Sequence, residues 1–248
     1  MGQIKTILHV HSNYSHDSNI SPAELVEQAR REGVDCLGIT DHDQIRGALD
    51  AQQIGGVRVI VGQEITTADG HLIGLFLNER IPPWLSVEES AARVKGQGGL
   101  VLAPHPFLTL CEFSLQSAVQ RILPLIDAVE IHNAQNPLFW QDWKTRGFIR
   151  RHGLTAYSGA DSHIRGFRWP AFQLMPDFDS PASFLAALQQ ARLVRGRYSP
   201  AYMSVMVFRH VYEARYGRPY GAFGKNCDPA RFARAGQTST RELQATLD

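Results

Sequence analysis

Short apolar runs rich in β-branched residues alternate along the chain with amphipathic segments that carry helix-start signals. This alternation is typical of repeated βα units and disfavours a sandwich or a helical bundle. The runs predicted as strands are residues 4–10, 34–40, 57–62, 72–77, 100–103, 127–131 and 154–159. Each is followed by a helix or an irregular connection, so the sequence predicts an α/β fold with a mostly parallel sheet or barrel.

Capping sequences mark the predicted helices. Ser21 and Glu24 form a capping box with proline at the first helical position, which predicts a helix to Glu32 that Gly33 ends. Ser86 and Glu89 repeat the capping-box signature before a helix predicted over residues 86–96. Further helices are predicted over residues 46–53 and 138–152, and Ser180 and Pro181 start another.

From Ser199 onward the pattern changes to aromatic residues mixed with arginine, and then to a tail containing Gly, Pro, Ser and Thr. Such a tail has little apolar surface to bury. We therefore predict a barrel domain over residues 1–198 and a C-terminal helical extension over residues 199–248, with a tail of flexible composition.

Composition narrows the functional class. The 25 Lys and Arg against 24 Asp and Glu leave a net charge of +1, which argues against a strongly basic nucleic-acid binder. The three cysteines, at positions 36, 111 and 227, lack CxxC spacing and fit a reducing compartment. Because there is no signal-like segment and no run of about 18 apolar residues, we expect a cytoplasmic protein without a membrane partner.

Histidines and acids gather where predicted strands give way to loops. They are His9, His11, Asp17, Asp41, His42, Asp43, Glu64, His105, Asp161 and His163. Loops at the carboxyl ends of parallel strands converge, so these side chains can meet in one pocket. Both imidazoles of His-x-His on an extended segment point to the same side. Imidazole and carboxylate together suit Zn, Mn or Fe, and a carboxylate such as Glu64 can bridge two ions.

Each of these residues has a simpler interpretation when taken alone. A single histidine is more often a hydrogen-bonded core or surface residue than a ligand, and we assign His16, His152 and His210 to that class. Asp41 could equally cap a helix. The joint pattern is more specific, because so many acids in one pocket would repel and protonate without cations.

Six short motifs resemble, in order, those of the PHP (polymerase and histidinol phosphatase) family: HVHSNYSHDS, GITDHD, GQE, GHLIGL, APHPF and SGADSH. The resemblance extends from about Ile4 to Arg197. It implies a distorted seven-stranded (β/α)7 barrel with a metal site at the C-terminal ends of the strands. It also implies three divalent ions and hydrolysis of phosphoesters.

The resemblance further implies a ligand set. One ion would be held by His9, His11, Glu64 and Asp161, a second by Asp17, His42 and His163, and a third by Glu64, His71 and His105. Every one of these positions carries a metal-competent residue, which favours an enzyme over a scaffold.

The third ion leaves two histidines as alternatives. His71 follows an Asp-Gly dipeptide, which favours a tight hairpin turn. In a regular hairpin His71 would pair near Ala68, too far from Glu64 to share an ion without a bend. The family pattern favours His71, and the competing ligand is His132 at the end of another predicted strand. Otherwise His132 could be a leaving-group acid or a substrate contact.

Residues beside the ligands have supporting roles in this interpretation. Asp41 and Asp43 flank His42 and could hold its tautomer or cap a helix. Arg165 and Arg168 lie just beyond the last ligand, where guanidinium groups could grip phosphate, although a solvated loop explains them equally well.

Two tryptophans, Trp84 and Trp169, could stack on a base, although packing is the simpler explanation. The arginines between Arg209 and Arg241 could similarly follow a nucleic-acid backbone.

The predicted reaction is attack on phosphorus by a hydroxide that bridges the ions, because bound cations lower the pKa of water. Asp161 would orient or deprotonate that water, and Glu64 would hold the ions together. The first functional hypothesis is a phosphatase acting on a small phosphorylated metabolite or nucleotide, and the second is a phosphodiesterase or exonuclease on short nucleic acid. A non-catalytic metal-binding module and metal-assisted hydrolysis of a C–N bond are further alternatives. Oligomeric state is open.

Overall fold

The computed structural model describes residues 2–108, 113–136 and 139–216. Its strands form one nine-stranded sheet. They are β1 (Gln3–Val10), β2 (Cys36–Ile39), β3 (Arg58–Thr67), β4 (Gly70–Leu75), β5 (Leu100–Ala103), β6 (Ala128–Asn133), β7 (Thr155–Ser162), β8 (Ala171–Pro176) and β9 (Arg192–Arg195).

The strands β1 to β7 close into a barrel, because β1 pairs with both β2 and β7. Ile7 of β1 pairs with Leu37 on one side, and Leu8 pairs with Gly159 on the other. The strands β8 and β9 extend the sheet outside this ring, since β8 pairs antiparallel with the first residues of β1. The predicted seven-stranded α/β barrel is therefore confirmed.

One strand of the ring runs against the others. β4 is antiparallel to both β3 and β5, whereas the remaining neighbours in the ring are parallel. The carboxyl end of β3 and the amino end of β4 therefore share one edge of the barrel, the edge at which the parallel strands also end.

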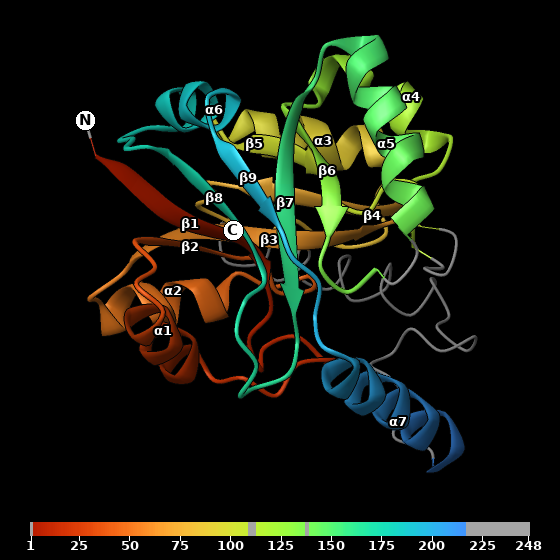
Figure 1. The fold of residues 1–248 in the computed structure, drawn as a ribbon. Helices are drawn as coiled ribbons and strands as arrows, with labels where there is room; N and C mark the ends of the chain where they lie inside the picture. Colours follow the sequence, from red (N-terminus) through yellow and green to blue (C-terminus); the bar gives the residue numbers. More distant parts are fainter. Residues whose placement is uncertain (1, 109–112, 137–138, 217–248) are drawn as a thin grey trace, which may run out of the picture. The chain divides into compact units, whose positions relative to one another are not determined.

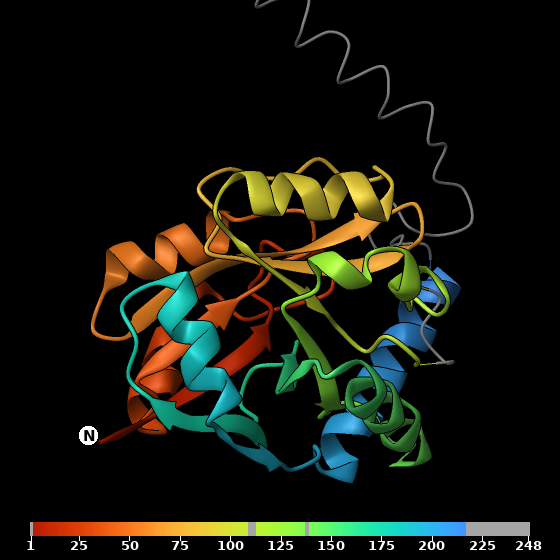
Figure 2. The same ribbon diagram turned by 90° about the horizontal axis from the view of Figure 1, so that it is seen from above.

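Seven described helices of the first 190 residues lie outside the strands (Figures 1 and 2). They are α1 (Pro22–Arg31), α2 (Arg46–Ile54), α3 (Val87–Gly96), α4 (Ala118–Arg121), the 3-10 helix η1 (Leu123–Leu125), α5 (Phe139–His152) and α6 (Pro181–Gln189). The last described helix is α7 (Pro200–Tyr216). The predicted caps are present: Ser21, Ser86 and Ser180 each accept a hydrogen bond from the backbone N–H three residues on. Such caps satisfy N–H groups that the first helical turn leaves without partners.

Apolar side chains pack on both faces of the barrel wall. One cluster joins the strands to α1, α2 and α3. The second includes Leu8, Ile60, Ile73, Leu102 and Tyr157. These five residues come from five different strands of the ring, so they meet in the barrel interior. The polar side chains at the carboxyl ends of the strands therefore lie above an apolar floor.

The chain divides into two compact units, Met1–Val205 and Met206–Asp248. The first holds all nine strands and residues 200–205, which the sequence assigned to the C-terminal extension. The boundary at residues 198–199 stays a prediction. The predicted flexible tail, Cys111 and Cys227 lie outside the described residues. Among the described helices, none combines the length and the apolar character needed to cross a membrane.

Candidate metal centre

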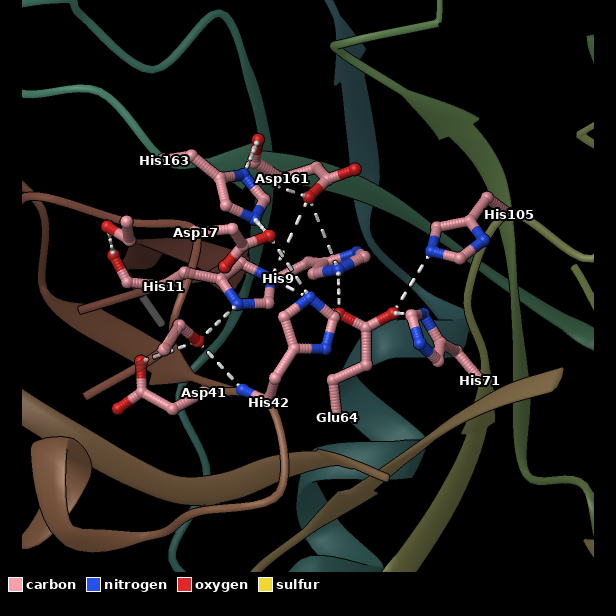
Figure 3. A network of polar contacts seen from close by, with 12 residues as sticks. His9, His11, Asp17, Asp41, His42, Glu64, His71, His105, Asp161 and His163 are labelled. Atoms are coloured by element: carbon pink, nitrogen blue, oxygen red, sulfur yellow. Dashed lines mark hydrogen bonds and ion pairs between the residues drawn. The ribbon is translucent and has the colours of Figure 1, made fainter. Parts of the chain in front are cut away.

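Histidines and carboxylates converge at the carboxyl ends of the barrel strands (Figure 3). They are all the residues predicted as metal ligands: His9, His11, Asp17, His42, Glu64, His71, His105, Asp161 and His163. The structure thus brings together side chains that are far apart in the sequence.

Glu64, near the end of β3, lies at the centre of this cluster and is only 1% exposed. Its Oε1 is 3.0 Å from Nδ1 of His71 and 3.0 Å from Nε2 of His105. Its Oε2 is 3.1 Å from Nε2 of His9 and 3.2 Å from Nε2 of His11. Because the two oxygens face different pairs of imidazoles, this carboxylate has the geometry to bridge two cations.

The other two carboxylates flank Glu64. Oδ2 of Asp17 is 2.9 Å from Nε2 of His163 and 3.3 Å from Nε2 of His42. Oδ1 of Asp161 is 3.5 Å from Nε2 of His9. Each carboxylate therefore faces a different part of the imidazole cluster.

Three of these positions have a left-handed backbone, with φ of 63° at His9, 26° at His105 and 49° at Asp161. Residues other than glycine seldom adopt this conformation, and it is concentrated at functional sites. In a regular strand Leu8 and His9 would face opposite sides of the sheet. The pairing of β1 with β7 is irregular between Leu8 and Val10, so both side chains reach the interior. The imidazoles of the His-x-His motif do meet, although the regular strand assumed in the prediction is interrupted.

The β3–β4 hairpin places His71 nearer to Glu64 than we expected. His71 pairs with Thr66 in the observed register, so the prediction that it pairs near Ala68 is wrong. Thr66 and Glu64 are two positions apart and face the same side of β3. His71 therefore reaches Glu64 from within a regular hairpin, without a bend.

His132 does not belong to the cluster. Its Nε2 donates a hydrogen bond of 2.8 Å to the backbone oxygen of Gly196, and its Nδ1 lies 3.1 Å from Oδ2 of Asp142. Arg197 donates to the same Asp142 oxygen at 2.8 Å. Because both ring nitrogens are engaged, His132 is corrected from an alternative ligand to part of a hydrogen-bonded network beside β6. His132 has no free ring nitrogen with which to act as a leaving-group acid or to contact a substrate, as the sequence had suggested.

The ligand atoms form overlapping groups in which all atoms lie within 4.8 Å of one another. The groups are His11, Asp17, His42 and His163; His9, His11 and Asp161; His9, Glu64 and His105; and His42, Glu64 and His71. The partition implied by the family resemblance is similar. It differs in three respects: Glu64 is not grouped with His9, His11 and Asp161; His11 joins the group of Asp17; and His71 and His105 occur in separate groups that share Glu64.

The donor atoms fit divalent cations. Nε2 of His11, Nδ1 of His71 and Nε2 of His163 are buried, and each lies 2.9–3.2 Å from a carboxylate oxygen of Glu64 or Asp17. An imidazole nitrogen without a proton offers a lone pair to a cation, and the carboxylate oxygens beside it can share that cation. The mixed nitrogen and oxygen set is compatible with Zn, Mn or Fe.

Neighbouring charges shift the pKa values in the cluster. Burial would raise the pKa of Asp161, but the nearby imidazoles, His9 first among them, lower it to about 2. Burial would lower the pKa of His42, but Asp17 and Glu64 raise it to about 10. Without cations, protonated imidazoles offset the carboxylates, and a divalent cation would have to displace those protons.

Asp41 supports a different histidine from the one we expected. It accepts a hydrogen bond of 2.5 Å from the backbone N–H of Ser12 and one of 3.3 Å from the hydroxyl of Ser15. The Ser15 oxygen lies 3.0 Å from Nδ1 of His11. Asp41 therefore acts on the orientation of His11 through Ser15, whereas the sequence had suggested the tautomer of His42.

Asp43 likewise does not hold the His42 ring. Its Oδ1 accepts a hydrogen bond of 2.8 Å from the N–H of Thr66, and its own N–H donates to the backbone oxygen of Glu64 at 2.9 Å. It therefore fixes the end of β3, where the central carboxylate lies.

Glu130, in β6, is the main site residue that the sequence analysis missed. Its buried carboxylate accepts hydrogen bonds from Nδ1 of His9 at 2.8 Å, from the N–H of His105 at 2.7 Å and from Nδ2 of Asn133 at 3.0 Å. Asn133 also donates to Asp161 at 2.8 Å. A carboxylate on Nδ1 leaves Nε2 of His9 free to face the cluster. The signal in the sequence was an acid within an otherwise apolar predicted strand.

The arginines predicted to bind phosphate are both exposed. The Arg165 guanidinium lies 3.4 Å from a carboxylate oxygen of Glu24 in the first turn of α1. Substrate contact by Arg165 or Arg168 stays a prediction.

Aromatic residues near the centre differ in exposure. Trp169 is 3% exposed, so packing accounts for it. Trp84 is half-buried, and its ring centroid lies 6.4 Å from that of Phe113. His16, which we had assigned to ordinary core or surface histidines, lies beside the cluster, with its ring centroid 5.1 Å from that of His42.

Comparison with known proteins places this site in context. The family model of the PHP domain matches residues 8–142. An uncharacterized protein of Methanocaldococcus jannaschii is 39% identical over 145 residues, which are 53% of this chain and 82% of that protein. A second uncharacterized protein of the same organism is 30% identical over 198 residues, 75% of this chain and 79% of that protein. A 5'-3' exoribonuclease of Haemophilus influenzae is 37% identical over 90 residues, 34% of this chain and 32% of the exoribonuclease.

Solved structures share the fold. A two-domain protein from Bacteroides vulgatus that contains a predicted PHP-like metal-dependent phosphoesterase aligns with a TM-score of 0.67 at 16% identity, over 84% of this chain and 69% of that chain. Endonuclease Q in complex with a 27-mer duplex aligns with a TM-score of 0.59 at 16% identity, over 76% of this chain and 57% of that chain.

Proposed function

The chain belongs to the PHP domain family, and from this premise we propose that it is a metal-dependent phosphoesterase, which hydrolyses phosphoester bonds at a centre of three divalent ions. We propose the clustered histidines and carboxylates as the ligands, and a small phosphorylated metabolite or nucleotide as the substrate.

The arrangement around Glu64 carries this proposal. Its two carboxylate oxygens face separate pairs of imidazoles, and the adjacent ligand groups overlap. A single structural ion would need four ligands in a closed shell, whereas overlapping groups can hold several ions at short separation with positions open to a substrate.

Divalent ions bound there would lower the pKa of water and neutralise charge on the phosphoryl oxygens. Asp161 has one oxygen held by Asn133, while the other points toward the imidazoles. Burial alone would raise the pKa of Asp161, but His9 and the neighbouring imidazoles lower it to about 2. The Asp161 carboxylate therefore stays ionised at neutral pH. We assign it to accept a hydrogen bond from the attacking water and to orient that water toward phosphorus.

The distribution of positive charge favours a small substrate. Among the described residues, Arg165 faces Glu24 and Arg197 faces Asp142, so these guanidinium groups near the centre are engaged within the protein. Binding along a nucleic-acid backbone requires several cations that contact successive phosphates. The net charge of +1 provides no general excess of such groups.

A phosphodiesterase acting on short nucleic acid is the second candidate. The similarity to the exoribonuclease of Haemophilus influenzae favours it, although that alignment covers only 34% of this chain. The metal chemistry would be shared by both candidates, and the groups that bind the rest of the substrate would differ.

Turnover of a nucleoside 5'-monophosphate and of a short oligonucleotide, measured at several salt concentrations with each metal, tests the proposal. We expect the wild type to hydrolyse the mononucleotide with a shallow salt dependence, and Glu64→Gln to be inactive because it loses the central negative charge. Preference for the oligonucleotide with a steep salt dependence would favour the second candidate. Metal binding without turnover on either substrate would contradict both and indicate a non-catalytic module.

A further inference from the structure

The segment from Gly196 to Tyr202, here called the C-terminal strap, follows β9 and includes the first three residues of α7. It lies beyond the residues that match the family model. Its backbone and side chains are hydrogen-bonded to β6, to α5 and to the loops that follow β6 and β7. The strap therefore contacts the elements that carry His163 and the residues behind the metal centre.

The first half of the strap is anchored beside β6. The backbone oxygen of Gly196 accepts the hydrogen bond from His132 at 2.8 Å. Arg197 donates to Asp142 at 2.8 Å, and the N–H of Tyr198 donates to the backbone oxygen of Ala134 at 3.2 Å. These contacts give His132 a structural role that its position in the sequence did not reveal.

The second half reaches a predicted ligand directly. Tyr202 is completely buried, and its hydroxyl accepts a hydrogen bond of 3.1 Å from the backbone N–H of His163. The Tyr202 ring stacks on Tyr198, with centroids 3.7 Å apart and planes 9° apart. Phe167 packs edge-on against Tyr202 at 5.1 Å. The hydroxyl is thus held in place by packing on two sides of the ring.

His163 needs such support because the sheet does not hold it. The last pairing of β7 with β1 joins Ser162 to Val10, so His163 lies just beyond the ladder. Its backbone oxygen accepts from the N–H of Asn19 at 3.2 Å, and its N–H is left to the Tyr202 hydroxyl. Both backbone groups that would otherwise be free to shift are thereby satisfied.

We propose that Tyr202 is a positioning residue for the metal position formed by Asp17, His42 and His163. It acts by fixing the backbone of His163, so that Nε2 stays near the Asp17 carboxylate, from which it is 2.9 Å away. This inference rests on the proposed function in one respect: it assumes that Asp17, His42 and His163 bind a cation. It extends the metal centre into the C-terminal segment of the chain.

The test compares Tyr202→Phe with Tyr198→Phe in the full chain. Both variants keep the stacked rings and remove one buried hydroxyl, but among the described residues no ligand N–H donates to the Tyr198 hydroxyl. Stepwise affinities for Mn²⁺, metal content after dialysis, and the visible absorption of the Co²⁺ form would be measured. Thermal unfolding of the metal-free proteins reports on folding.

We expect Tyr202→Phe to lower the affinity for one of the bound ions by roughly two- to tenfold, the effect of one neutral hydrogen bond. The Co²⁺ absorption should change at that position alone. Tyr198→Phe should bind like the wild type. Equal affinities in both variants and the wild type would overturn the inference, as would uniform weakening of all ions by Tyr202→Phe.

A second variant distinguishes a local effect on this metal position from a general loss of stability. In a D17N background the same metal position has already lost a ligand. Adding Tyr202→Phe to that variant should not lower the affinity for the remaining ions further. Further weakening would overturn the inference. If the wild type itself binds fewer than two ions, the proposed function fails first. If it binds three and only the Tyr202 comparison fails, the proposed function stands and the inference alone is wrong.

Discussion

Replacing Glu130 by Gln tests whether the buried carboxylate of β6 sets the chemistry of the cluster. The carboxylate accepts from the His9 ring on one oxygen, and from the N–H of His105 and the amide of Asn133 on the other. Gln has one oxygen and one NH2 group, so it cannot accept all three hydrogen bonds. If its oxygen faces His105, its NH2 group faces Nδ1 of His9 and favours the tautomer with a proton on Nε2. That proton blocks the nitrogen that faces Glu64, 3.1 Å away.

The opposite orientation of Gln is also unfavourable, since its NH2 group would then face two N–H donors. Loss of such a partner of a ligating histidine typically weakens metal binding or activity by about 10- to 100-fold, or about 1.4–2.8 kcal/mol. Metal affinity, measured by competition with a chelator, and turnover of a phosphoester should fall together by this factor.

The matched control for this substitution is Asp127→Asn. Asp127 accepts from Lys95 and from the N–H of Val101, at the amino ends of the strands. We expect this change to leave metal affinity unaltered. Wild-type metal affinity in Glu130→Gln would refute the argument that this carboxylate fixes the His9 tautomer.

Other parts of the site give further predictions. His71→Ala should lower the number of bound ions, measured by metal analysis, whereas His132→Ala should keep that number and lower the melting temperature; the reverse result would restore His132 as the ligand. Gly159→Ala should reduce stability by about 1–3 kcal/mol and weaken metal binding, because a Cβ there would overlap the buried carboxylate of β6. Its control, Gly147→Ala in α5, meets no atom within 4 Å, and denaturant unfolding should show unchanged or increased stability. Metal binding should release a proton from His42, whose pKa Asp17 and Glu64 raise to about 10 despite burial, so affinity should fall roughly tenfold per pH unit from pH 9 to pH 7. Calorimetry in buffers of different ionisation enthalpy would show no buffer dependence if this proton is absent.

The strands, the caps and the convergence of the candidate ligands were predictable because their signals are local. Apolar runs mark the seven strands of the ring, and serine caps mark the starts of α1, α3 and α6. Ligand types at strand ends converge by the geometry of any parallel barrel. The strands β8 and β9 were not predicted, since each is short and partly exposed and is held by pairing to the edge of β1 or to the other.

Supporting residues were harder to predict because their roles depend on contacts far apart in the sequence. Glu130 acts on His9, which is 121 positions away, and Tyr202 acts on His163 from a helix outside the family motifs. Which histidine the Asp41 carboxylate supports depends on where Ser15 lies in the folded chain. The pairing of His71 with Thr66 depends on the length of the turn between β3 and β4. An error of one residue in the predicted turn length would change the register of the hairpin.

The most direct test of the central claim is anomalous X-ray diffraction from crystals of the metal-loaded protein, with the ions counted and their ligands identified. We predict three ions, with Glu64 in contact with more than one of them and the remaining clustered histidines and carboxylates completing the coordination. Fewer than two ions at these residues, or a Glu64 carboxylate that contacts none, would contradict the proposed metal centre.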